Sequence, residues 1–422
     1  MRLSLEERQI LKGEQGETTK NVLQTLIDYG NLVGAKNLVP ITSSIGQVHF
    51  SYGTKAFDNA ILILNKLSSH GLKSKIDLVS NPKPFANTFG KHKFLNAKLS
   101  YKKIYFNRQD VLEQELKKLN VNSYSCGCFE QQDKIDYGDV CAWSESVAIT
   151  YINSVLGAKS NENPPIIDLF CNIMKKTLNY GLLLDENRRA GIAIKLEVGK
   201  EIDPQLLGET IAKKCEGKVP IIFGLEKILK ANLDQPTLAF LKDFSAGFSC
   251  GGKVRLFHIN GITPEVKLLK KQIIKSKIKT IVIDEQDLEK NKQDYEIMWK
   301  NPDSKAKLCI LGCPHLSLYQ LVNLTNEIGW ELRQNKKNKL KIKTYFLTSS
   351  KTMEKFKELP EFKELIKYGG IISSFCPLMG MNLKRISKTN IITNSNKLRC
   401  FSTARFFEEE QIIKQICGGR IR

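Results

Sequence analysis

Short apolar segments alternate with helical segments along most of the chain, and this alternation limits the possible folds more than any other feature. The apolar segments end in turn-forming residues and lie at 37–44, 75–82, 103–110, 219–226, 280–287, 306–314, 341–350, 370–377 and 389–396. Helical periodicity marks 1–35, where two helices are expected, and also 110–119, 204–215 and 316–328. Alternation of this kind predicts an α/β fold with mainly parallel sheets.

Size and targeting signals narrow the class of protein. The chain has 422 residues, 41% of them hydrophobic, which predicts two to three domains with packed cores. Charged loops suit connections between lobes, so boundaries are expected near 160 and at 290–305. No run of about 18 uncharged apolar residues occurs, and the N-terminal segment is charged where a signal peptide is apolar. We therefore expect a soluble, cytoplasmic protein without a membrane span.

The charge balance is strongly basic, with a formal net charge of +21 and a pI of about 9.4. Clustered Lys and Arg would suit binding to nucleic acid. However, Lys far outnumbers Arg and is spread along the chain, whereas bidentate contacts to bases and phosphates usually come from Arg. The densest basic run, 333–343, reads as a solvated loop before a strand. Nucleic acid is therefore not favoured, and the charge is also compatible with an anionic small-molecule substrate.

Three of the eleven cysteines follow predicted strands: Cys126, Cys313 and Cys376. Ligands of open α/β sheets gather beyond the carboxyl ends of the strands, so these cysteines are candidates for one metal site. No CxxC pair is present, which disfavours zinc ribbons and thioredoxin motifs. Cys128 is an alternative ligand to Cys126. Cys309 also competes, although its place inside an apolar strand predicts a core position.

The segment GCPHLSL places Cys313, Pro314 and His315 directly before a helix. Pro suits the first helical position, and helix N–H groups aimed at a sulfur would favour its thiolate. Cys376 and Pro377 repeat this order after another strand. His315 is either a proton donor or orienting group near a metal, or a helix-start histidine bonded to backbone.

Two further polar residues have open interpretations. Glu145 lies near the start of a helix predicted within 141–161, where it is an acid or base, or only a favourable charge at the helix dipole. Arg188 lies in a loop, where it holds a substrate carboxylate or forms a surface ion pair. His258 is expected in the core, and Thr263 is expected to cap a helix that begins at Pro264.

Several motifs together resemble the large subunit of the aconitase X family, which comprises aconitase-like hydro-lyases. The motifs are EERQILKGEQGE (6–17), GAKNLVPI (34–41), SNP (80–82), AWSESVAITYINSVLGAKSN (142–161), LDENRRA (184–190), FHINGITPE (257–265), GCPHLSL (312–318) and TNS (393–395). The resemblance covers residues 1 to about 400, leaving 401–422 as a tail or helix. It implies an aconitase-like fold, with several α/β lobes around a central cleft.

The resemblance also implies an iron–sulfur cluster, of the [4Fe-4S] type, held by Cys126, Cys313 and Cys376. Three ligands on four irons leave one iron open as a Lewis acid. At Cys126 the family's Cys-Thr-Pro-Tyr segment is replaced by CGCF. The implied substrate-binding residues are His49, Phe50, Ser51, Asn81 and Pro82. The family's Gly-Val-Ser-Tyr loop is changed here, and a different gap would place Gly46, Gln47 and Val48 in it instead.

Archaeal members of the family resemble dehydratases of (R)-5-phosphomevalonate, which form trans-anhydromevalonate 5-phosphate in isoprenoid synthesis. The resemblance implies that the catalytic base is a serine on a separate small subunit, a swivelling domain, so the chain would act in a heterodimer. A second interpretation is the bacterial branch, which resembles a cis-3-hydroxy-L-proline dehydratase. A third, from another class, is a non-catalytic descendant that binds metal or nucleic acid.

Overall fold

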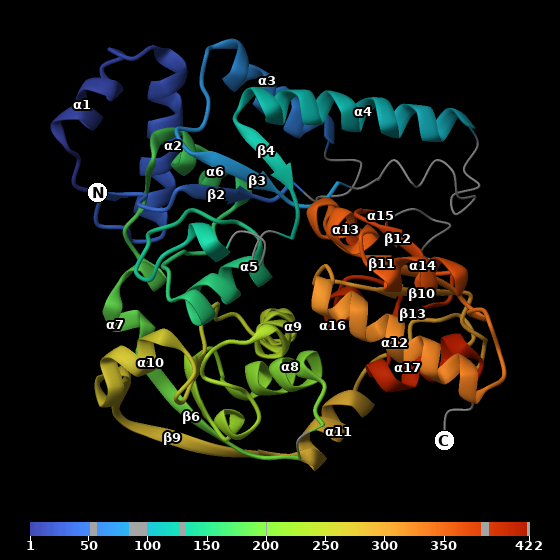
Figure 1. Ribbon diagram of the computed structural model, residues 1–422. Helices are drawn as coiled ribbons and strands as arrows, with labels where there is room; N and C mark the ends of the chain where they lie inside the picture. Colours follow the sequence, from blue (N-terminus) through green and yellow to red (C-terminus); the bar gives the residue numbers. More distant parts are fainter. Residues whose placement is uncertain (51–56, 84–98, 127–131, 200, 381–387, 420–422) are drawn as a thin grey trace.

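The protein, analysed as a computed structural model, contains three α/β lobes, each built on its own parallel sheet (Figure 1). The structure describes residues 1–50, 57–83, 99–126, 132–199, 201–380 and 388–419. The paired strands of all three sheets are parallel. The predicted fold class, α/β with several lobes built on mainly parallel sheets, is therefore confirmed.

The first lobe, blue to green in Figure 1, is built on the sheet β2–β3–β4. Its strands are β2 (Ile45–Val48), β3 (Asp77–Ser80), β4 (Val121–Tyr124) and a separate antiparallel pair, β1 (Leu38–Pro40) and β5 (Lys176–Leu178). Its helices are α1 (Leu5–Leu11), α2 (Glu17–Leu32), α3 (Phe57–Ser69), α4 (Leu99–Lys118), α5 (Ser146–Tyr151) and α6 (Pro165–Met174). The two helices expected in 1–35 are confirmed, and α1 begins with a capping box between Ser4 and Glu7.

The second lobe, green to yellow, has strand order β8–β7–β6–β9. Its strands are β6 (Ala190–Glu197), β7 (Pro220–Phe223), β8 (His258–Ile259) and β9 (Ile274–Asp284). Its helices are α7 (Asp185–Arg188), α8 (Pro204–Lys214), α9 (Gln235–Gly251), α10 (Pro264–Leu269) and α11 (Glu285–Gln293). A core shared with α5 of the first lobe fills the space behind this sheet and includes Phe244, Phe248 and Phe257.

The third lobe, orange to red, has strand order β12–β11–β10–β13–β14. Its strands are β10 (Leu308–Leu311), β11 (Lys343–Leu347), β12 (Ile371–Ser373), β13 (Ile391–Thr393) and β14 (Arg405–Phe406). Its helices are α12 (Leu318–Gln334), α13 (Ser350–Lys357), α14 (Pro360–Lys367), α15 (Pro377–Gly380), α16 (Asn396–Cys400) and α17 (Glu409–Cys417). Strands and helices thus alternate along the third lobe, as the sequence predicts.

Two predictions about the elements are wrong. The segment 103–110 was predicted as a strand, but it lies inside α4, because it continues directly into the helical pattern of 110–119. The predicted helix start at Pro314 is also wrong, since α12 begins four residues later at Leu318. Ser317 caps this helix, and Gln320 completes the capping box.

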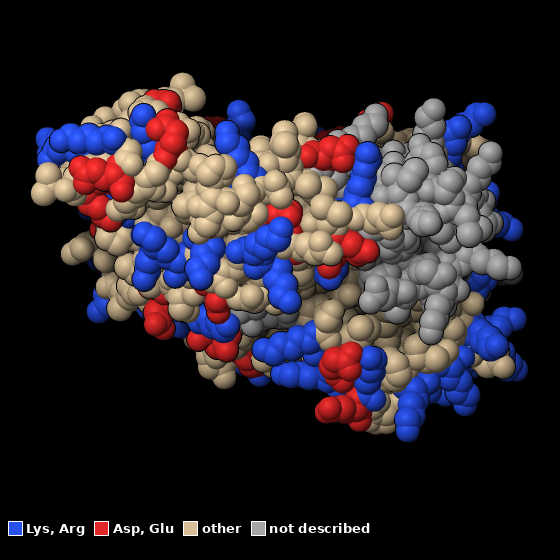
Figure 2. Space-filling view, turned by 90° about the horizontal axis from the view of Figure 1, so that it is seen from above, with Lys and Arg blue, Asp and Glu red and all other residues tan. Residues whose placement is uncertain are grey.

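Charged side chains do not collect into one stripe on the face shown in Figure 2. Lys and Arg lie there in several separate groups, with Asp and Glu between them. Many of the described Lys residues pair with neighbouring carboxylates, as Lys214 does with Asp287 at 2.5 Å. Among the described helices, none combines the length and the apolar character that crossing a bilayer requires.

Candidate active site

Cys126, Cys313 and Cys376 leave the carboxyl ends of β4, β10 and β12 and come together where the first and third lobes meet. Burial raises the pKa of the Cys126 thiol well above its ordinary value, and the neighbouring Cys313 and Cys376 raise it further. Burial also raises the pKa of Cys313 to about 12 and that of Cys376 in the same direction. The structure therefore brings together three thiols from two sheets, of which Cys313 and Cys376 are buried and Cys126 is partly exposed. Cys128 lies outside the described residues, and Cys309 is buried within β10, as predicted.

His315 connects these cysteine segments. Its backbone N–H donates to the sulfur of Cys126. Its ring Nε2 lies 3.2 Å from the carbonyl oxygen of Phe375, so Nε2 carries the proton and donates to the residue before Cys376. Burial lowers the pKa of His315 to about 4, which keeps the ring neutral at pH 7. His315 is thus bonded to backbone, although it lies before α12 and not at its start, and its contacts hold the segments of two candidate ligands.

N–H groups at the start of a helix reach the sulfur of Cys376 but not that of Cys313. Pro377 is the first residue of α15, and the N–H groups of Leu378 and Met379 donate to the Cys376 sulfur and oppose the effect of burial on its pKa. Cys313 precedes a cis peptide bond to Pro314 and lies outside α12. The Lys397 ammonium, rather than a helix, opposes the effect of burial on the Cys313 pKa.

Lys397 and Glu145 form a buried ion pair beside the cysteines. Glu145 caps α5, where its Oε2 accepts from the N–H of Ala148 at 2.8 Å, and its Oε1 contacts Lys397 Nζ. Burial raises the pKa of Glu145, but the Lys397 charge, His49 and the hydrogen bonds from Lys397 and the Ala148 N–H together make the net shift downward. Burial lowers the pKa of Lys397, but Glu145 and the neighbouring thiols together make the net shift upward. Both groups are therefore charged at pH 7, and their charges act on the thiols of Cys313 and Cys376.

The predicted substrate-binding segments, 49–50 and 81–82, also lie next to the cysteine site. Asn81 Oδ1 accepts from the N–H of Phe50 at 2.7 Å, and the N–H of His49 donates to Ser144 Oγ at 2.8 Å. Asn81 Nδ2 lies 3.6 Å from the sulfur of Met379 in α15. The N–H of Cys376 donates to the carbonyl of Lys83, one residue beyond Pro82, at 2.8 Å.

His49, Phe50, Asn81 and Pro82 thus lie at the ends of β2 and β3, facing α15. Burial lowers the pKa of His49 to about 4, and Glu145 and Lys397 act on this pKa with opposite signs. Ser51 lies outside the described residues.

The alternative alignment would place the substrate loop in β2. Gly46, Gln47 and Val48 form the buried strand β2. A Cβ on Gly46 would lie 2.2 Å from Asn172 Oδ1, so this glycine serves close packing against α6. Gln47 Oε1 accepts from the N–H groups of Ser144 and Glu145 at 3.1 and 2.9 Å. This strand therefore positions Glu145 from behind and offers little room for a ligand.

Arg188 does not reach the cysteines. Only 2% of the residue is exposed, so its interpretation as a surface ion pair is wrong. Its Nε donates to Glu265 Oε1 at 2.6 Å, and its Nη2 donates to the carbonyls of Asn153 and Ala158. His258 is buried as predicted, and its Nε2 donates to the Arg188 carbonyl at 2.8 Å. These residues of the LDENRRA and FHINGITPE motifs fix the junction between the first two lobes.

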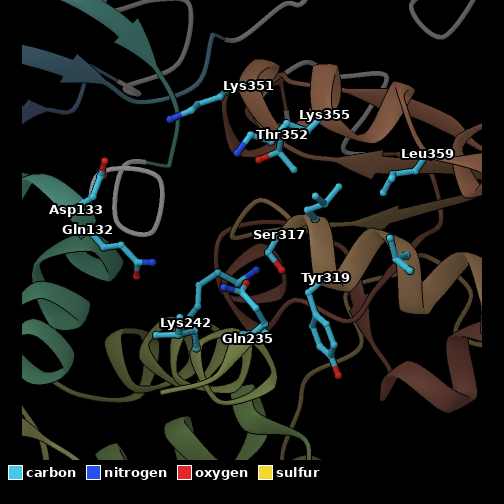
Figure 3. Close-up of a pocket in the computed structure, with 14 residues that line it drawn as sticks. Gln132, Asp133, Gln235, Lys242, Ser317, Tyr319, Lys351, Thr352, Lys355 and Leu359 are labelled. Atoms are coloured by element: carbon cyan, nitrogen blue, oxygen red, sulfur yellow. The ribbon is translucent and has the colours of Figure 1, made fainter. Parts of the chain in front are cut away.

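A cleft of about 640 Å³ opens beside the site, between α9, α12 and α13 (Figure 3). Gln132 and Asp133 line one side of it, and Lys351 and Thr352 of α13 lie across from them. Lys242 extends from the α9 wall and donates to the His315 carbonyl at 2.8 Å. The cleft is therefore connected through Lys242 to the segment that holds Cys313.

Three cysteine sulfurs are the candidate metal ligands of this site. Thiolates are ligands for zinc, copper(I) and iron–sulfur clusters, and a bound metal supplies the positive charge that three adjacent thiolates require. Within the described ranges, no three His, Cys, Asp or Glu side chains are grouped closely enough to hold one metal ion. Cysteines of an iron–sulfur cluster need not meet at one ion, because each binds a different iron. Among the residues that the structure describes, three cysteines that converge without meeting at one ion therefore fit a cluster better than a single metal ion.

The sequence motifs include TNS (393–395), but neither Ser395 nor Lys397 was identified there as a site residue. Ser395 Oγ contacts the Cys313 carbonyl and caps α16, and this turn directs Lys397 toward Glu145. The available signal was the position of TNSNK at another strand end, with the capping residue Ser395 two positions before the lysine.

Comparisons with known proteins agree with the sequence motifs. Family models described as the aconitase X first, second and third domains match residues 1–186, 189–293 and 306–413. The phosphomevalonate dehydratase large subunit of Thermococcus kodakarensis is 29% identical, covering 98% of this chain and all of the relative. The same subunit of Methanosarcina mazei is 30% identical, covering 100% of this chain and 98% of the relative.

More distant is a cis-3-hydroxy-L-proline dehydratase of Hypocrea jecorina, which is 24% identical over 77% of this chain and 52% of the relative. Among solved structures, the holo-form of Thermococcus kodakaraensis aconitase X matches with a TM-score of 0.80 and 25% identity. The match covers 99% of this chain and all of that chain.

Proposed function

This chain belongs to the aconitase X family and is an enzyme of the hydro-lyase class, and we propose that it dehydrates (R)-5-phosphomevalonate to trans-anhydromevalonate 5-phosphate. Full-length similarity to two phosphomevalonate dehydratase large subunits supports this substrate. The observation that carries the proposal is the convergence of Cys126, Cys313 and Cys376 with the 49–50 and 81–82 segments around the Glu145–Lys397 pair.

Cys126, Cys313 and Cys376 would hold the proposed [4Fe-4S] cluster. When bound, such a cluster supplies a Lewis acid that accepts the hydroxyl group lost from the substrate. The backbone N–H of His315 donates to the sulfur of Cys126, and the N–H groups at the start of α15 donate to the sulfur of Cys376. The neutral His315 ring bonds the Phe375 carbonyl and so fixes the segment that carries Cys376.

The charged residues of the chain have separate roles in this proposal. Lys397 places a positive charge beside the thiols, where it attracts an anionic substrate and stabilises negative charge that develops as a proton leaves carbon. Glu145 holds Lys397 in this position and keeps it protonated. Asn81 fixes the backbone at Phe50, so that the two substrate segments present one surface.

A small subunit with the swivelling domain is part of the proposal, because the relatives are named large subunits. The described site offers no unpaired carboxylate near the cysteines as a base, since Glu145 is ionised and engaged by Lys397 and by the Ala148 N–H. A base supplied by the partner is consistent with this arrangement. The cleft between α9, α12 and α13 is one route by which substrate or partner would approach.

The test is anaerobic co-purification with the small subunit, followed by iron and sulfide analysis and turnover assays. We expect about four irons and four sulfides per chain, as a [4Fe-4S] cluster requires. We also expect turnover of (R)-5-phosphomevalonate and none of cis-3-hydroxy-L-proline. Turnover of hydroxyproline alone would favour the more distant branch, and a folded complex without iron would favour a non-catalytic descendant.

A pair of cysteine variants separates ligation from folding. Cys376→Ser should lose most of the iron, because a hydroxyl is a poor ligand for cluster iron. Cys309→Ala is the matched control, because Cys309 is buried in the same lobe within β10 and faces the core. This control should retain iron. Equal iron in both variants would contradict the ligand assignment.

A further inference from the structure

A second pair of cysteines lies outside the site described above, at the contact between α9 and α16. Cys250 is the next-to-last residue of α9, and Cys400 is the last residue of α16. The two side chains are in hydrogen-bonding contact, and α16 packs against α9. Cys400 is exposed and Cys250 is partly exposed, so small reagents have access to the pair.

A network of fixed charges surrounds Cys400. Arg399 Nη2 lies 3.2 Å from the Cys400 sulfur and also donates to Glu209 Oε1 at 2.8 Å. The Arg399 guanidinium stacks 3.7 Å from the ring centre of Tyr295, and its Nε donates to Asn396 Oδ1 at 2.7 Å. These contacts hold the permanently charged guanidinium of Arg399 against the sulfur of Cys400.

The surroundings assign different roles to the two thiols. The hydrogen bond from Cys250 lowers the pKa of Cys400, and the Arg399 charge lowers it further against the opposing effect of burial. The same hydrogen bond raises the pKa of Cys250, together with burial. An exposed thiol beside an Arg, in contact with a second and less acidic thiol, is the arrangement of an attacking and a resolving cysteine.

We propose that Cys250 and Cys400 form a redox-active dithiol that is oxidised to an intramolecular disulfide by low-molecular-weight disulfides. The Cys400 thiolate attacks one sulfur of the small disulfide, which forms a mixed disulfide and releases one thiolate. The Cys250 sulfur then attacks the Cys400 sulfur and releases the second thiolate, which takes the Cys250 proton. Two electrons pass from the protein to the small disulfide, and excess dithiol reverses the reaction.

The position of the pair gives oxidation a structural consequence. A bond between Cys250 and Cys400 ties the second lobe to α16, the helix that carries Lys397 one turn earlier. Oxidation therefore restrains the helix that presents Lys397 to Glu145. The proposal does not depend on the identity of the substrate.

The experiment uses the full chain with its cluster, kept anaerobic and incubated with glutathione disulfide at pH 7. Iron is measured in parallel, so that thiols released by cluster loss are recognised. Alkylation and peptide mass mapping should show a 250–400 disulfide at unchanged iron, and reduced dithiothreitol should restore both thiols. Cys215, which is 2% exposed, is the internal reference and should stay reduced.

Two variants test the roles of the thiols. In the Cys250→Ser variant the reaction should stop at the mixed disulfide, with one glutathione bound to Cys400. In the Cys400→Ser variant Cys250 should stay unmodified. As a measurement independent of variants, Cys400 of the wild-type chain should be alkylated at least 10-fold faster than Cys250 at pH 7. Glutathione that stays on wild-type Cys400 without an internal disulfide, or an unreactive Cys400, would overturn the proposal.

Discussion

Breaking the buried Glu145–Lys397 pair is expected to destabilise the protein strongly. Only 10% of the Glu145 side chain and 11% of the Lys397 side chain are exposed. Lys397→Met removes the ammonium and leaves an ionised carboxylate that only the Ala148 N–H and its neighbours stabilise. Removing one partner of a buried pair costs about 3–5 kcal/mol, because the other charge stays buried without compensation. We expect a loss of this size in the free energy of unfolding at pH 7, measured by denaturant titration.

A surface pair provides the matched control. Lys195 and Glu197 are 2.6 Å apart, but their side chains are 59% and 54% exposed. Lys195→Met should therefore change the free energy of unfolding by no more than about 1 kcal/mol. The double variant Glu145→Gln/Lys397→Met should recover most of the loss seen in the single variant, since no buried charge is left. A double variant as unstable as Lys397→Met, or a single variant no worse than Lys195→Met, would refute this reasoning.

The pH dependence of the pair has a defined sign. The pKa of Glu145 is lowered from its ordinary 4.5, so its contribution to stability is present above 4.5 and is lost as pH falls through the lower folded value. The pKa of Lys397 is raised from 10.5, so its contribution is present below 10.5 and is lost as pH rises through the higher folded value. The stability difference between wild type and the double variant should therefore be nearly constant between these two ordinary values.

Three further predictions concern other buried contacts. His315→Ala removes the bond to the Phe375 carbonyl and should lower the iron bound per folded chain several-fold, with His315→Gln retaining more; unchanged iron would argue against an orienting role. Arg188→Met leaves Glu265 buried and unpaired and should cost about 3–5 kcal/mol of unfolding free energy, measured by denaturant titration. Burial lowers the pKa of His258 from 6.5 to about 4, so the free energy of unfolding should fall as pH drops from 6.5 to 4. His258→Gln should reduce the slope of unfolding free energy against pH in this range. An unchanged slope would contradict this role of His258.

The positions of the cysteines could be predicted because they depend on a general property of parallel sheets. Cys126, Cys313 and Cys376 each follow a strand, and strand ends of parallel sheets gather on one edge. The first of them comes from a different sheet from the other two, so their meeting also requires the lobes to face each other. Strand patterns carry no information about that arrangement, and the family resemblance supplied it.

Other parts of the site could not be read from local patterns. Lys397 was missed because a lysine in this chain is most often a solvated surface residue, and only its contact with Glu145, 252 positions away, makes it a buried one. Arg188 was misplaced for the same reason, since its partners at 153, 158 and 265 are distant in sequence. Segment 103–110 was misread because a short apolar run fits a strand or a helix equally well until its neighbours are considered.

The order of residues in Cys-Pro-His follows from what each must do at the end of β10. Cys313 has to place its sulfur near Cys376, while the next residues must turn the chain toward Cys126 before α12 begins. Pro314 lies in this turn and has no backbone N–H that would need a partner there. His315 then has its N–H free for the Cys126 sulfur and its ring free for the Phe375 carbonyl. Because α12 begins only at Leu318, His315 lies in the turn before it and contacts the segments of cysteines from two lobes.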